Sequence, residues 1–100
     1  MSKPYYSEYV KHALRFYSRN CSSRPTFKSD ADKYNWLSCD SVLSRYPSYM
    51  REILLSVYSG YDTLPDEVYK VSKEHNIEQN LIWDSMKELE RKIAKRRELI

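Results

Sequence analysis

The sequence predicts an all-α domain of about five helices. Apolar residues recur every three to four positions, turn-forming residues fall between these repeats, and glycine occurs once in 100 residues. One glycine leaves too few positions for the tight hairpins of a β-sandwich or for phosphate-cradling loops. With 41% hydrophobic residues, the chain has enough apolar surface for one core and not for two. We therefore expect a single domain over residues 1–100.

Three packing helices are predicted within residues 1–62, where they form an N-terminal layer. The first covers about residues 4–19 and is followed by a polar, proline-containing loop over residues 20–29. Ser29 or Asp30 caps the second helix, because a short side-chain oxygen satisfies a free N–H of the first turn. The apolar stripes of the two helices are Tyr6, Val10, Ala13 and Tyr17, with Tyr9 and Leu14 beside them, and Trp36, Cys39, Leu43 and Tyr46.

The third helix is predicted between a proline and the single glycine. Pro47 fits its first turn, where the missing N–H costs nothing. Gly60 suits a left-handed exit from its last turn. The expected buried face consists of Met50, Ile53, Leu54 and Val57.

Residues 63–100 predict two further helices joined by a tight turn. Thr63 with an acid three positions later, Asp66, resembles a capping box, and the fourth helix runs to about residue 75. Asn76 accepts positive φ and breaks the chain before the last helix, which covers about residues 78–97. The buried positions are Val68, Val71, Ile82, Met86, Leu89 and Ile93. The stripe of the last helix suits either the core or a two-fold seam of a homodimer.

The last two helices have the spacing of a helix-turn-helix, the DNA-reading unit of many regulators. This motif needs a small residue at the helix crossing, a residue tolerant of positive φ four positions later, and apolar residues that pin the turn and the second helix. The residues at these positions are Val71, Ser72, Asn76, Ile77 and Ile82. His75 and Ser85 depart from the pattern, because apolar residues are usual at both positions.

The segment TLPDEVYKVSKEHNIEQNLIWDSMKELERKIAKRRELI, residues 63–100, resembles the C-terminal part of small phage and mobile-element regulators. These proteins are similar to region 4 of sigma factors, as in the RinA and ArpU families, and their final helix ends in basic residues, as RKIAKRR does here. The resemblance covers less than half of the chain. It implies binding of double-stranded DNA and control of transcription, with RNA polymerase or another protein as a second partner. The implied recognition positions are Gln79, Asn80, Trp83, Asp84 and Lys87.

The residue types at these positions favour DNA contacts. Gln and Asn pair bidentately with adenine in the major groove, and Lys suits phosphate or guanine. We therefore assign base reading to Gln79, Asn80 and Lys87. Phosphate contacts are assigned to Arg91, Lys92, Lys95, Arg96 and Arg97. Lys11 and Arg15 join them only if the first helix lies on the same side of the molecule.

A protein-interaction adaptor or inhibitor with a helix-turn-helix scaffold is the alternative function. Glu78 and Asp84 place negative charge where DNA is negative, and Trp83 suits a protein contact better than a DNA groove. The net charge of +3 is mild for a nucleic-acid partner. Surplus tyrosines that mark a candidate exposed patch are Tyr5, Tyr49, Tyr58 and Tyr61.

No pattern in the sequence predicts catalysis, a metal site or a cofactor. Cys21 and Cys39 lack metal-site spacing, His12 and His75 stand alone, and no segment places a nucleophile beside a base. No apolar run reaches the ~18 residues of a membrane span, and the N-terminal residues lack the apolar core of a signal peptide. We expect a non-enzymatic, cytoplasmic protein without a membrane partner.

Overall fold

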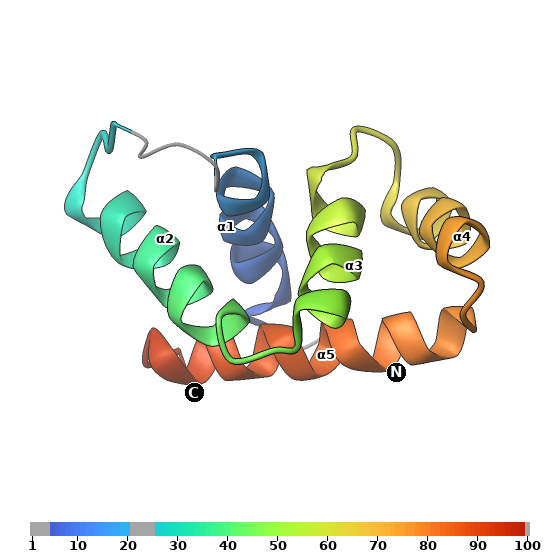
Figure 1. Ribbon diagram of the computed structural model, residues 1–100. Coiled ribbons are helices and arrows are strands. Elements are labelled where there is room, and N and C mark those ends of the chain that lie inside the picture. The colour runs from blue at the N-terminus through green and yellow to red at the C-terminus, as the bar shows by residue number, and fades with distance from the viewer. Residues whose placement is uncertain (1–4, 21–25, 100) are drawn as a thin grey trace.

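The computed structural model describes residues 5–20 and 26–99, and most of these residues are helical. The elements are α1 (Ser7–Asn20), α2 (Asp30–Leu43), α3 (Ser48–Ser59), α4 (Leu64–His75) and α5 (Gln79–Arg96) (Figure 1). Within the described ranges there is no strand, so the all-α prediction of five helices is confirmed. The predicted start of the first helix near Pro4 and the residue Cys21 lie outside the described residues.

Helix α5 packs against each of the other four helices. In Figure 1 it runs along one edge of the molecule, and α1, α2, α3 and α4 all stand on the same side of it. Helix α1 also packs against α2 and α3, and α3 packs against α4. Helices α1, α2 and α3 therefore share one core with α4 and α5.

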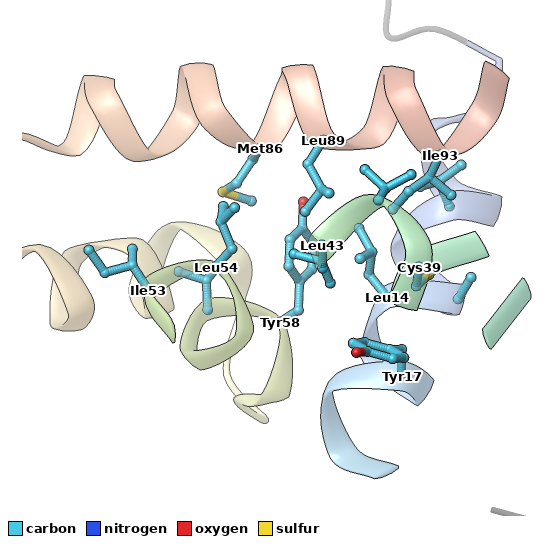
Figure 2. Close-up of a cluster of buried hydrophobic side chains, with 14 of the residues drawn as sticks. Leu14, Tyr17, Cys39, Leu43, Ile53, Leu54, Tyr58, Met86, Leu89 and Ile93 are labelled. Carbon is cyan, nitrogen blue, oxygen red and sulfur yellow. The ribbon is translucent and has the colours of Figure 1, made fainter. Parts of the chain in front are cut away.

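The predicted apolar stripe of α5 lies in this core. Met86, Leu89 and Ile93 point toward the side chains of α1, α2 and α3 (Figure 2), and Ile82 is equally buried. Because its own chain covers this stripe, the stripe is not free to form the seam of a homodimer. The core prediction for these residues is confirmed.

Two helix starts are capped as the sequence predicts. The Ser29 hydroxyl oxygen accepts a hydrogen bond from the Asp32 N–H at 3.2 Å, and the Thr63 hydroxyl oxygen accepts one from the Asp66 N–H at 3.4 Å. Each bond satisfies a backbone donor that the first turn of a helix leaves without an intrahelical partner. Local sequence therefore sets where α2 and α4 begin.

The prediction for Gly60 is wrong. Its backbone is extended, with φ −69° and ψ 159°, so α3 ends without a left-handed residue. A Cβ atom at this position would overlap the carboxylate of Glu67, so a larger residue requires that carboxylate to move. That carboxylate is buried and accepts a hydrogen bond from the Asp62 N–H at 3.3 Å. The α3–α4 connection is thus held by a side chain from α4.

Two tyrosine assignments are also wrong. Tyr58, predicted on the surface, is 1% exposed, because it follows Leu54 by one helical turn and faces α5. Tyr9, predicted in the core, is 43% exposed, and its hydroxyl donates to the Asn35 side chain at the edge between α1 and α2. The stripe residues that are only half-buried are Tyr6, Trp36, Tyr46 and Met50.

The left-handed turn residue Asn76 gives a first testable prediction. With φ 54° and ψ 51°, it occupies a region that costs most L-residues ~1–2 kcal/mol. Asn76→Ala is expected to lower the free energy of unfolding by about 1 kcal/mol, whereas Asn76→Gly is expected to change it by less than roughly 0.5 kcal/mol. Urea denaturation of both variants measures the difference. Equal stability of the two variants would contradict the role assigned to the turn.

Candidate nucleic-acid interface

The turn between α4 and α5 has the features that its spacing predicted. Asn76 adopts the left-handed conformation, and its N–H donates to the carbonyl of Ser72. The Ile77 N–H donates to the same carbonyl at 3.1 Å, and the Ser72 hydroxyl donates in return to the Ile77 carbonyl. Ile77 is half-buried against the core. Ser72 therefore accepts two backbone hydrogen bonds and donates one, and these three bonds connect the end of α4 to the turn.

The face of α5 opposite the core is open along the whole helix. Its exposed residues recur at spacings of three and four, which places them along one side. This exposed line consists of Asn80, Asp84, Lys87, Arg91 and Lys95. Gln79 is also exposed, in the first turn. Trp83 is half-buried and packs against the core, so it is not part of the line.

The exposed line carries more positive than negative charge. The cations of Lys87, Arg91 and Lys95 make no ion pair or hydrogen bond with another side chain among the described residues, and Asp84 is the one carboxylate in the line. An exposed cation without a partner remains available to a ligand. These three cations recur at intervals of one helical turn from the middle of α5 to its C-terminal end.

Lys92 is partly neutralised within the chain. Its Nζ lies 2.9 Å from Glu88 Oε1 and 5.1 Å from the centre of the Tyr46 ring. The Tyr46 hydroxyl donates to the same carboxylate oxygen at 3.0 Å. These two hydrogen bonds, with that from Lys92 the larger cause, lower the pKa of Glu88. Burial, followed by the neighbouring Glu88, raises the pKa of the Tyr46 hydroxyl, which therefore remains a donor.

The sequence predicts a phosphate contact for Arg97, whereas in the structure its side chain makes an intramolecular contact. Its Nε donates to Asn35 Oδ1 at 2.7 Å, and its guanidinium lies 5.9 Å from the Tyr34 ring centre. Hydrogen bonding to Arg97 and then to Asn35 lowers the pKa of the Tyr9 hydroxyl. Arg97 therefore links the C-terminal end of α5 to α2 and α1.

Lys11 and Arg15 lie apart from the α5 face. They line a separate groove with the first residues of α4, and no α5 residue contributes to it. The Lys11 ammonium also lies 3.8 Å from the carboxylate of Glu8 in the preceding turn. Helix α1 therefore does not bring Lys11 and Arg15 beside the basic side chains of α5, and we do not expect them to join the phosphate contacts.

A basic groove lies between the α2–α3 connection and the C-terminal half of α5. It encloses about 690 Å³, and its lining includes Arg45, Tyr46, Glu88, Lys92, Lys95 and Arg96. Sequence reasoning missed Arg45, because it lies in another segment and no local pattern relates it to α5. Only the packing of the corner against the helix brings these residues together.

The structure is that of a small all-α protein whose last two helices, α4 and α5, are joined by a turn with Asn76 in the left-handed conformation. Comparison of the chain with protein-family models, with curated proteins and with solved structures gave no match. Among residues 5–20 and 26–99, no helix has the length and apolar character needed to cross a membrane. The free thiol of Cys39 is fully buried, and burial raises its pKa to about 12, which makes it a poor nucleophile.

Proposed function

We propose that this chain is a non-enzymatic, DNA-binding transcription regulator. It contacts double-stranded DNA through the helix-turn-helix of α4 and α5, as the resemblance of residues 63–100 to phage and mobile-element regulators implies. The observation that carries the proposal is the exposed line of α5, which presents Lys87, Arg91 and Lys95 without partners in the described chain. RNA polymerase or another protein is the implied second partner.

The length of α5 separates base contacts from phosphate contacts. At ~1.5 Å of rise per residue, Lys95 lies about 22 Å along the helix from Asn80. The major groove is only ~12 Å wide, so a helix that inserts its N-terminal turns carries its last turns onto the flanking backbone. Gln79, Asn80 and Lys87 then face base edges, and the basic C-terminal half faces phosphates.

Selection from a random double-stranded DNA library tests this proposal directly. The purified protein is incubated with the library at low and at physiological salt, and the retained DNA is sequenced. We expect an enriched motif and an affinity that falls steeply with salt, because each phosphate contact releases counterions. Absence of binding even at low salt would exclude direct DNA reading by the isolated protein.

The alternative function, a protein-interaction adaptor on the same scaffold, has weaker support. Its main anchor, Trp83, is half-buried against the core rather than presented to a partner. The exposed tyrosines contact different parts of the chain, since Tyr61 lies under Arg19 and Tyr49 lies beside His75. The DNA-binding proposal therefore has more support, and the variants Lys95→Glu with Arg96→Glu and Trp83→Ala separate the two functions.

A further inference from the structure

We infer that the groove between the α2–α3 connection and α5 binds phosphate groups of the DNA backbone, with Arg45 as a contact from outside the helix-turn-helix. This inference rests on the proposed DNA-binding function and names a part of the interface that residues 63–100 do not contain. It also gives the N-terminal helices a role in binding in addition to packing. In Figure 1 the α2–α3 connection lies beside the C-terminal half of α5.

The charges of the groove point to an anionic occupant. The groove contains one carboxylate, that of Glu88, which already pairs with Lys92. Its four cations are those of Arg45, Lys92, Lys95 and Arg96. Arg45, Lys95 and Arg96 are exposed, and none of them forms an ion pair or side-chain hydrogen bond within the described part of the chain. Like charges held close together without counter-charges raise the affinity of the site for an anion.

Helix dipoles do not account for this excess of positive charge. The carboxyl ends of α2 and α5 contribute about half a negative charge each. Those two ends and Glu88 together offset about two of the four cations. The amino end of α3, where Pro47 lines the groove and no side chain caps the helix, adds about half a positive charge. A net positive charge therefore remains for a ligand.

The position of the groove matches a backbone phosphate rather than a base edge. Its α5 residues run from Glu88 to Arg96, which lie about 12–24 Å beyond Asn80 along the helix. This distance places them at or past the edge of a ~12 Å major groove. The planar guanidinium of Arg45 can donate two parallel hydrogen bonds to a phosphate, a geometry that a lysine cannot reproduce. The groove thus extends the proposed phosphate-contacting surface from the C-terminal half of α5 to the α2–α3 connection.

The test compares single variants in binding to a DNA duplex, with the full-length protein and a series of salt concentrations. Arg45→Ala is expected to weaken binding about tenfold at low salt and to reduce the salt slope by about 0.9, as loss of one phosphate contact does. Arg51→Ala is the matched control, because Arg51 lies on α3 and lines a different groove. Glu88→Gln is expected to have the opposite effect, since it frees Lys92 and removes the carboxylate.

The outcomes separate this inference from the proposed function. If the wild-type protein binds DNA and Arg45→Ala binds equally well, the groove is not a phosphate site and the helix-turn-helix proposal stands. If Arg45→Ala and Arg51→Ala weaken binding equally, the effect is one of total charge and the inference is also wrong. If the wild-type protein does not bind the duplex at low salt, both are wrong. Circular dichroism of each variant verifies that the helices are retained.

Discussion

Reversing two charges near the end of α5, with Lys95→Glu and Arg96→Glu together, is expected to weaken binding of double-stranded DNA on the order of 100-fold or more at low salt. Both side chains are exposed and line the basic groove, and neither is paired with another described side chain. The variant changes the charge of the surface by four without removing a core contact. The new carboxylates oppose the negative end of the α5 dipole at a cost of only about 0.3–1 kcal/mol each, so the main effect falls on binding.

Fluorescence anisotropy with a labelled duplex at several salt concentrations measures this effect. A matched control is Lys28→Glu with Lys33→Glu, which makes the same change of net charge at exposed positions away from α5 and the groove. A loss specific to the α5 variant, with a reduced salt slope, supports DNA contact there. An equal loss in the control would show that only total charge matters.

Trp83→Ala separates DNA binding from the adaptor function. Because Trp83 is half-buried behind the exposed line of α5, DNA binding predicts a much smaller effect from this variant than from Lys95→Glu with Arg96→Glu. An adaptor predicts the reverse, namely a dominant effect of Trp83→Ala with little dependence on salt. That second result would contradict DNA binding and support a protein-interaction adaptor.

Removing one hydroxyl from the core, with Tyr58→Phe, is expected to lower the free energy of unfolding by about 2 kcal/mol. The Tyr58 hydroxyl donates to Glu90 Oε2 at 2.7 Å, and the Ser7 hydroxyl donates to Glu90 Oε1 at 3.0 Å. Glu90 is only 7% exposed, so the variant leaves a buried carboxylate oxygen without its donor. Burial and then the charge of Glu90 raise the pKa of the Tyr58 hydroxyl, so it stays protonated and donates.

A double-mutant cycle in urea isolates this interaction. In a Glu90→Leu background the carboxylate is gone, and Tyr58→Phe is then expected to cost less than roughly 0.5 kcal/mol, because both partners have become apolar. Glu90→Gln alone is expected to cost less than Tyr58→Phe, since the amide oxygen still accepts one hydroxyl and its amino group donates to the other. A Tyr58→Phe variant as stable as the wild type would disprove the structural role of the network.

Part of the candidate site could be predicted from the sequence. The positive φ of Asn76 and the exposure of Asn80, Lys87 and Arg91 follow from residue type and helical spacing, which act within a few positions along the chain. The sequence could not predict which of the cations of α5 are engaged by other side chains and which are free to bind a ligand. Arg97 is engaged by Asn35 of α2, whereas Arg96 next to it is not engaged within the described chain, and the sequence treats the two alike.

The positions of the helices, two of their caps, the turn before α5 and the face of α5 that enters the core follow from the amino-acid sequence. These features depend on hydrogen bonds and side-chain spacing within one or two helical turns. Three features do not follow from the sequence: the joint burial of Tyr58 and Glu90, the extended Gly60 beside Glu67, and the position of Arg45 across a groove from α5. Each of these depends on how one helix packs against another, and the apolar spacing within a single helix contains no information about which neighbour covers which face.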